Sequence, residues 1–255
     1  MNLEELLGIV TDLGAQMLWH GAEIHRVEDT VGRISATYGV YADVFAIPSS
    51  LTITLTDSAQ HFSTRTRRLY GQDVNLDRVE QLNALARYIC AQSPTYGVVE
   101  ARLAEIRRRP VYGPRLQIAF SALTASAFAL LFGGGLGEAV ASLLLGSIIR
   151  WVCILLARVQ SSIIFINIVG GAISALGAMT CVQLAPGMVA DSIIISTLML
   201  LVPGLTFTNA LRDLIAGDLI TGIMKLAEAL LVASGIAIGV MLSLAVWRHV
   251  TGGVL

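Results

Sequence analysis

Four long stretches without a charged residue constrain the fold of this chain more than any other feature. They cover residues 116–137, 159–190, 192–211 and 229–247. A helix needs about 20 apolar residues to cross a hydrocarbon core of about 30 Å, so each stretch can hold a membrane-spanning helix. Residues 138–157 are a fifth candidate, with Arg150 near one end. The sequence therefore predicts five transmembrane helices, at about 115–133, 137–156, 162–184, 191–210 and 222–247.

The charged residues divide the chain into two chemically different halves. A soluble domain carries about 25% charged residues, whereas this chain carries 14%, and 25 of its 35 charged residues lie within the first 115 positions. We therefore predict a water-soluble domain at 1–110 and a transmembrane domain at 111–255. The net charge of −1 argues against a nucleic-acid surface, because phosphate binding needs a strong local excess of Lys and Arg.

The hydrophobic period changes within the first 110 residues. Apolar residues recur every three or four positions over 3–18 and 24–34, as in amphipathic helices. From Tyr41 to Arg67 the period is two, which predicts three short strands. Asn75 can cap a further helix, and a charged helix follows it. The predicted fold class is a membrane all-α bundle of about five transmembrane helices, preceded by a small α+β domain.

Basic residues near the ends of the predicted spans set the orientation. They lie before the first span, between the second and third, and between the fourth and fifth: Arg107, Arg108, Arg109, Arg115, Arg150, Arg158, Arg212 and Lys225. The opposite side carries only Arg248. Because basic loops stay in the cytoplasm, we expect a cytoplasmic 1–110 domain and a C-terminus outside. The acidic start of the chain lacks the basic and apolar regions of a signal peptide, so we expect the N-terminus not to be exported.

The densest polar cluster of the membrane half begins at a Pro-Gly pair. Pro203 removes a backbone hydrogen bond and Gly204 loosens the next turn, so the fourth predicted span should be broken there. Broken helices expose their ends to the substrate in secondary transporters. Asn209 and Asp213 follow, four residues apart on one helix face.

Further ionisable residues follow this break. Lys225 and Glu228 are three residues apart and can pair. Ionisable side chains at membrane depth usually face a protein interior or a water path. The predicted substrate-binding residues are Pro203, Gly204, Asn209, Asp213 and Lys225. The predicted ion-coupling or gating residues are Asp218 and Glu228.

Simpler explanations of the same residues stay open. The Pro-Gly pair can form only a packing kink, and the two aspartates can end a helix at the membrane surface. Lys225 can extend toward the interface, with Glu228 only neutralising its charge.

The soluble half contains a run from His20 to Glu28 that suggests a metal site. At about 100° per residue, His20 and Glu23 share a helix face, whereas His25 points about 140° away from His20. One helix cannot gather three ligands from this spacing, so we expect no metal ion and instead a buried polar network or an interface. No GxSxG, HExxH or Walker motif and no Cys-His pair is present, so we predict neither an enzyme nor a cofactor.

Taken together, these motifs resemble the threonine/serine exporter family, and specifically the larger, YjjP-like subunit of its split form. The resemblance covers nearly the whole chain. In the soluble half it rests on His20-Gly21-Ala22-Glu23, Val27-Glu28, Thr54, Thr64-Arg65 and Val74-Asn75-Leu76. In the membrane half it rests on Leu201-Val202-Pro203-Gly204, Asn209-Ala210, Asp213-Leu214, Gly217 and Thr221-Gly222 through Lys225. Related sequences commonly carry Arg at the position of Lys225, so the charge is kept but the bidentate grip on a carboxylate is not.

The resemblance implies an inner-membrane secondary transporter that exports threonine/serine or succinate-type dicarboxylates, driven by an ion or proton gradient. It also implies a partner, a small membrane subunit that supplies further transmembrane helices, and a higher oligomer is compatible with this organisation. We expect His20, Glu23 and Arg65 to form a polar network in the soluble domain. The alternative is a membrane-anchored sensor or enzyme whose soluble domain carries the activity. Pure anchors rarely carry Asn, Asp, Lys and a Pro-Gly break at membrane depth, which disfavours this alternative.

Overall fold

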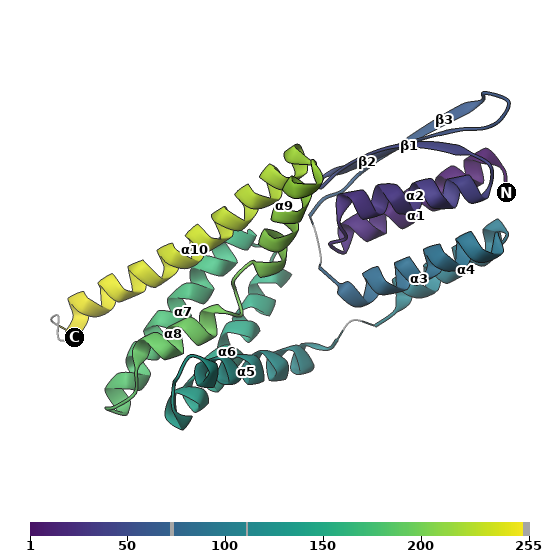
Figure 1. Ribbon diagram of the computed structural model, residues 1–255. Helices are drawn as coiled ribbons and strands as arrows, with labels where there is room; N and C mark the ends of the chain where they lie inside the picture. Colours follow the sequence, from purple (N-terminus) through teal and green to yellow (C-terminus); the bar gives the residue numbers. More distant parts are fainter. Residues whose placement is uncertain (72–73, 111, 252–255) are drawn as a thin grey trace. The chain divides into compact units, whose positions relative to one another are not determined.

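The computed structural model describes residues 1–71, 74–110 and 112–251 (Figure 1). The N-terminal elements are α1 (Leu3–Trp19), α2 (Ile24–Thr37), β1 (Tyr41–Ile47), β2 (Ser50–Thr56), β3 (Phe62–Arg68), α3 (Leu76–Gln92) and α4 (Tyr96–Arg108). The helices that follow are α5 (Pro114–Leu131), α6 (Leu136–Arg158), α7 (Ile163–Leu184), α8 (Ala190–Leu198), α9 (Gly204–Ala216) and α10 (Leu219–Thr251). The chain forms two compact units, Met1–Pro110 with Phe207–Leu226, and Val111–Thr206 with Ala227–Leu255.

The α+β part of the first unit is layered. α1 packs against β2 and β3, and α2 packs against β1, so the two helices cover one face of the sheet. α3 and α4 pack in turn against this helical layer (Figure 1). Its core is apolar and fully buried, and includes Leu13, Met17, Leu51, Ile53 and Leu82.

Local sequence explains where these helices begin and end. Asn2 and Glu5 form a capping box, in which each side chain accepts a hydrogen bond from the backbone N–H of the other. Asn75 caps α3 by accepting a hydrogen bond from the backbone N–H of Arg78 at 3.1 Å, which confirms its predicted role. Gly21 stands between α1 and α2 with a φ of +89°, a left-handed conformation that favours glycine.

The sheet is antiparallel in the order β1-β2-β3, which confirms the three strands predicted between Tyr41 and Arg67. Leu51, Ile53 and Leu55 of β2 are fully buried on one face. The alternate β2 positions are threonines that bond to threonines of β3 on the opposite face. The hydroxyl pairs are Thr52–Thr66 at 3.1 Å and Thr54–Thr64 at 2.9 Å.

The helical region contains four helices that are long and apolar enough to cross a membrane, judged over the described residues. They are α5, α6, α7 and α10. The chain is therefore an α+β region followed by a multi-pass helical region, as predicted. Four of the five predicted spans are continuous helices.

The fourth predicted span, 191–210, is instead divided between two shorter helices. α8 ends at Leu198 and α9 begins at Gly204, so the break predicted at Pro203 and Gly204 is present. Pro203 has no N–H to donate, and it also disfavours a helical conformation at the residue before it. Length and hydropathy alone cannot distinguish such a broken segment from a continuous span.

Glycines allow α7 and α10 to approach closely within the second unit, as small residues do in membrane helices. A Cβ added at Gly171 would lie 2.6 Å from the carbonyl oxygen of Ile236. A Cβ added at Gly239 would overlap the carbonyl oxygen of Ile168. No real side chain fits at either position, so this pair of helices requires glycine at both.

Candidate functional site

The corner between α9 and α10 is built from a helix-terminating glycine. Gly217 has a φ of +97°, and its N–H donates to the carbonyl oxygen of Leu214 at 3.2 Å. The N–H of Asp218 donates to the carbonyl oxygen of Asp213 at 2.9 Å. These two bonds form a Schellman motif, which ends α9 at Ala216 and lets α10 begin at Leu219. We refer to this segment as the α9–α10 corner.

A second glycine brings the two helices together beyond the corner. A Cβ added at Gly222 would lie 2.5 Å from Cγ of Leu214 and 3.0 Å from its backbone nitrogen. Only a hydrogen atom fits in this space. Leu214 follows Asp213 directly, and Lys225 lies one helical turn after Gly222, so the close approach brings Asp213 and Lys225 together.

Asp213 and Lys225 form a buried ion pair. Nζ of Lys225 donates to Oδ2 of Asp213 at 2.8 Å. Asp213 is 0% exposed and Lys225 is 5% exposed. Oδ1 of Asp213 is also buried and has no hydrogen-bond partner among the described residues. The sequence suggested that Lys225 could pair with Glu228, but Glu228 is exposed and the structure pairs Lys225 with Asp213.

Two side chains of α9 contact the loop at residues 20–23, which joins α1 to α2 within the same unit. Nδ2 of Asn209 lies 3.5 Å from the carbonyl oxygen of Gly21. Arg212 donates to Oε1 of Glu23, whose side chain is only 14% exposed. The other carboxylate oxygen of Glu23 lies 3.4 Å from Nε2 of His25. α9 is therefore held against the α+β part of the first unit by an ion pair and an amide contact.

The 20–23 loop is itself fixed by the start of α3. The carbonyl oxygen of His20 accepts a hydrogen bond from the backbone N–H of Asn75 at 3.1 Å. Nε2 of His20, a buried residue, lies 3.3 Å from a guanidinium nitrogen of Arg78. His20 ends α1 while Glu23 caps α2, so the two residues do not share one continuous helix.

Arg65 lies apart from His20 and Glu23. It is exposed on β3, and it forms no ion pair with any described residue. A Cβ added at Gly8 of α1 would lie 3.4 Å from its guanidinium. The structure thus connects Glu23 to Arg212 and His20 to Arg78, and leaves Arg65 outside both contacts.

Glu28 of α2 interacts electrostatically with the α9–α10 corner. Burial raises the pKa of the Glu28 carboxyl above 4.5, and the negative charge of Asp218 raises this pKa further. The backbone N–H of Ala46, which donates to Oε1 of Glu28 at 3.3 Å, opposes part of the rise in pKa. The sequence motif that contains Glu28 gives no sign of this interaction. Its proximity to Asp218 depends on tertiary packing that the sequence does not reveal.

The predicted site residues fall into two groups in the structure. Seven of them belong to the first unit: Asn209, Asp213, Asp218, Lys225, His20, Glu23 and Arg65. The remaining three belong to the second unit, and they are Pro203, Gly204 and Glu228. Gly204 is nevertheless the first residue of α9, the helix that carries Asn209 and Asp213.

The second unit contains buried hydroxyl groups that the sequence analysis did not single out. The hydroxyls of Ser142 and Ser196 are 2.8 Å apart, and those of Ser174 and Thr197 are 2.7 Å apart. All four residues are 0% exposed. These contacts join α8 to α6 and α7 just before the break at Pro203. The sequence signal for these contacts is the presence of serine and threonine in otherwise apolar helices. Hydroxyl pairs of this kind also occur in the ordinary packing of membrane helices, so the signal does not identify a functional site.

No group of three or more His, Cys, Asp or Glu side chains suited to a metal ion occurs within 1–71, 74–110 and 112–251. The chemistry that these residues offer is that of a buried ion pair, one buried carboxylate oxygen without a partner among the described residues, and polar contacts between α9 and the 20–23 loop.

The family of the chain follows from the similarity of its sequence to known proteins. A family model of threonine/serine exporters, ThrE, matches residues 8–247. The chain is 26% identical to "Probable succinate transporter subunit YjjP" of Escherichia coli (strain K12) over 238 residues, which cover 92% of this chain and 91% of that protein. No solved structure matches the chain.

Two further relatives are longer than this chain. "Probable threonine/serine exporter" of Mycobacterium tuberculosis is 25% identical over 71% of this chain but only 34% of that protein. "Threonine/serine exporter" of Corynebacterium glutamicum is 26% identical over 94% of this chain and 50% of that protein. The chain thus spans about a third and a half of the length of these two relatives. Since the family model matches nearly the whole chain, the protein belongs to the threonine/serine exporter family, a family of membrane transporters.

Proposed function

We propose that this chain is one subunit of an inner-membrane secondary transporter that exports small carboxylate-bearing metabolites. The observation that carries the proposal is the buried pair of Asp213 and Lys225, in which the second carboxylate oxygen of Asp213 is buried and has no partner among the described residues. Burying two opposite charges is costly unless their geometry is favourable. Ionisable residues retained in a membrane protein despite this cost usually serve a substrate or ion pathway.

The pair supplies a chemical basis for binding a carboxylate. The Asp213 carboxylate occupies the ammonium group of Lys225, so a substrate carboxylate that reaches Lys225 competes with Asp213 for the same donors. Lys225 has three donors, so it can hold a carboxylate without the fixed bidentate geometry of arginine.

The remaining predicted residues have secondary roles in this proposal. Asn209 lies one turn before Asp213 on α9 and offers a polar amide to the substrate. Pro203 and Gly204 supply a helix end, and Asp218 and Glu228 are the candidates for ion coupling or gating. Asp218 is the better supported of these two, since its charge acts on the pKa of Glu28 within the same unit.

Threonine/serine and succinate-type dicarboxylates are the substrates we propose. The names of the relatives support both classes, since two are named threonine/serine exporters and one is named a succinate transporter subunit. The word "subunit" supports a partner, which we propose to be a small membrane protein that supplies further transmembrane helices. We also propose that the 1–110 domain lies in the cytoplasm and that the C-terminus, which is outside the described residues, lies on the other side.

Efflux measurements test the proposed function. Cells or vesicles containing this chain alone, or this chain with its candidate small partner, are loaded with labelled threonine or labelled succinate. We expect efflux only when both proteins are present and a proton gradient is applied. If correctly inserted protein produces no efflux of either solute with the partner present, the proposed function is wrong, and a sensor or enzyme role of the soluble domain becomes the better explanation.

A further inference from the structure

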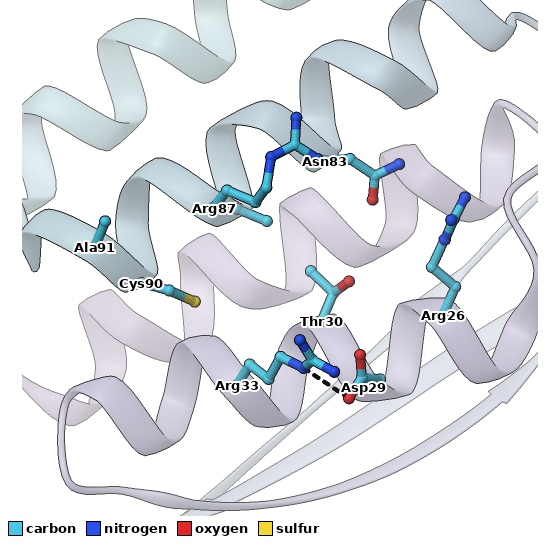
Figure 2. A pocket seen from close by; sticks show the side chains of 9 residues that line it. Arg26, Asp29, Thr30, Arg33, Asn83, Arg87, Cys90 and Ala91 are labelled. Carbon is cyan, nitrogen blue, oxygen red and sulfur yellow. Dashed lines mark hydrogen bonds and ion pairs between the residues drawn. The ribbon is translucent and has the colours of Figure 1, made fainter.

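A polar groove lies between α2 and α3, on a part of the first unit that contributes nothing to the Asp213–Lys225 pair. Its volume is about 560 Å³, which is within the range of pockets for small ligands, about 300–1,000 Å³. α2 contributes Arg26, Thr30 and Arg33, and α3 contributes Asn83 and Arg87, as Figure 2 shows. These side chains recur at helical spacing, so each helix presents one polar stripe to the groove.

The groove carries an excess of positive charge. It is lined by three arginines and a single carboxylate, that of Asp29. Nε of Arg33 donates to Asp29 at 2.9 Å, so this acidic group is already paired (Figure 2). Arg26 and Arg87 form no ion pair or hydrogen bond with any described residue. These two guanidinium groups, one on each helix, are therefore available to bind an anion.

The other lining groups suit an anion with hydrogen-bonding oxygens. The groove also contains the side chains of Thr30, which is buried, and Asn83, which is partly exposed. Both can donate to a carboxylate or phosphate oxygen. Arginine binds either group through two parallel N–H donors, which makes these pairs stronger than neutral hydrogen bonds.

We propose that the α2–α3 groove is a binding site for a small soluble anion with two or more negative charges, such as a dicarboxylate or a phosphate-bearing metabolite. The site is separate from the pair that we assign to transport. It acts by joining α2 to α3 through Arg26 and Arg87.

The position of α2 connects this groove to the candidate transport site. α2 is one helix, capped by Glu23, and Arg26 lies only three residues after that cap. Glu23 contacts Arg212 of α9. An anion that fixes α2 against α3 also fixes the position of Glu23, so a bound anion orders the contact with α9. The groove is thus an effector site for the transporter.

Binding to the purified full-length chain in detergent tests the site without relying on transport. Phosphate, succinate and acetate are titrated by calorimetry at constant ionic strength. We expect phosphate or succinate to bind and acetate, which has one charge, to bind at least about tenfold more weakly, since a charge-assisted hydrogen bond contributes enough for this difference. The double variant Arg26→Gln/Arg87→Gln should lose binding by about tenfold or more.

Arg108→Gln is the matched control, because Arg108 is an exposed arginine of the same unit outside the groove. If neither dianion binds, or if the double variant binds as tightly as the wild type, the proposal is overturned. A water-soluble, short-chain phosphatidylglycerol is titrated as well, to test whether the groove prefers a lipid headgroup phosphate to a free anion. Binding of that lipid alone, without phosphate or succinate, would also overturn the proposal of a soluble ligand.

Hydrogen exchange tests the connection to α9. Adding the anion that binds should slow amide exchange in α2 and α3 and also in residues 207–216 of α9, and Arg26→Gln/Arg87→Gln should abolish this change. Slower exchange confined to α2 and α3 would refute the effector role.

Discussion

Lys225 of α10 and Asp213 of α9 meet across a corner of the chain, with 2.8 Å between Nζ and Oδ2. The two residues are twelve positions apart, and the corner that joins them depends on Gly217 and Gly222. The candidate transport site is therefore a product of how two helices turn and pack, and not of one helix face.

Removing either charge of this pair should abolish export and destabilise the protein. Asp213→Asn leaves the buried ammonium of Lys225 without a counter-charge, and Lys225→Met leaves the carboxylate alone. Breaking a buried ion pair from one side costs about 3–5 kcal/mol. We expect a loss of this size in the free energy of unfolding, measured in detergent, and no labelled efflux from cells that contain the inserted protein.

The double variant Asp213→Asn/Lys225→Met separates stability from function. It buries no unpaired charge, so its unfolding free energy should lie closer to that of the wild type, while efflux remains absent. Glu228→Gln, an exposed change on the same helix, is the control for stability. Normal efflux from both single variants would show that the site is elsewhere.

Adding one methyl group at Gly222 should separate Asp213 from Lys225, although Gly222 contacts neither charge directly. The Cβ of Gly222→Ala would lie 2.5 Å from Cγ of Leu214, so α9 and α10 would have to separate. Overpacking of this kind costs about 1–3 kcal/mol, and efflux should fall because Lys225 moves away from Asp213. Gly32→Ala is a matched control, since no atom lies within 4 Å of the added Cβ and alanine favours a helix. Equal effects of the two substitutions on unfolding would contradict the close approach.

Exchanging the charges of the ion pair between Glu23 and Arg212 tests whether this contact matters for transport. Glu23→Arg and Arg212→Glu each place like charges together, so each should reduce efflux. The combined variant should recover most of it. Because the Arg212 side chain is 55% exposed, the coupling energy should be only about 0.2–1 kcal/mol in unfolding experiments. Arg67→Gln, which breaks an ion pair with Asp12 elsewhere in the same unit, should leave efflux unchanged. Without recovery in the combined variant, the contact has no role in transport.

Glu28 should make the stability of the first unit depend on pH. Its folded carboxyl has a pKa raised above 4.5 by burial and by Asp218, so above pH 4.5 the folded state holds a proton that the unfolded state has lost. The free energy of unfolding should then fall as the pH rises from about 4.5 through the raised pKa. Glu28→Gln keeps an acceptor for the N–H of Ala46 and should remove this part of the decline.

Denaturation of Glu28→Gln and wild-type protein at several pH values measures this difference. The stability of the variant relative to the wild type should increase as the pH rises above 4.5. Glu100→Gln, an exposed substitution on α4, should show no such trend. A constant difference between Glu28→Gln and wild type would exclude a raised pKa at Glu28.

The parts of the fold that local chemistry determines could be predicted from the sequence. The alternating threonines of β2, the cap at Asn75 and the missing N–H of Pro203 each act within a few residues, and each prediction agrees with the structure. The pairing of Lys225 could not be predicted in this way. A spacing of three favoured Glu228, whereas the observed partner requires a left-handed Gly217 and a helix contact at Gly222.

The contacts of α9 with the α+β part also could not be predicted from the sequence. Nothing in residues 207–226 indicates that they pack with the first 110 residues, because Arg212 and Glu23 are separated by 189 positions. The motif from His20 to Glu28 was identified as polar and unusual, but its partners are residues of α3 and α9 that no periodicity connects to it. The arginines of the α2–α3 groove look like ordinary solvated helix positions until two helices are placed face to face.

The two edge strands of the sheet affect how the purified protein behaves in solution. In the described part of the chain, β1 and β3 each pair with β2 alone, so each presents one row of backbone groups to other molecules. Such edges invite strand-to-strand association between chains, and charged side chains on an edge oppose it. β3 carries Arg65, Arg67 and Arg68, all exposed. We expect these arginines to protect the solubilised protein against aggregation, and we expect variants that neutralise all three to precipitate when the protein is concentrated.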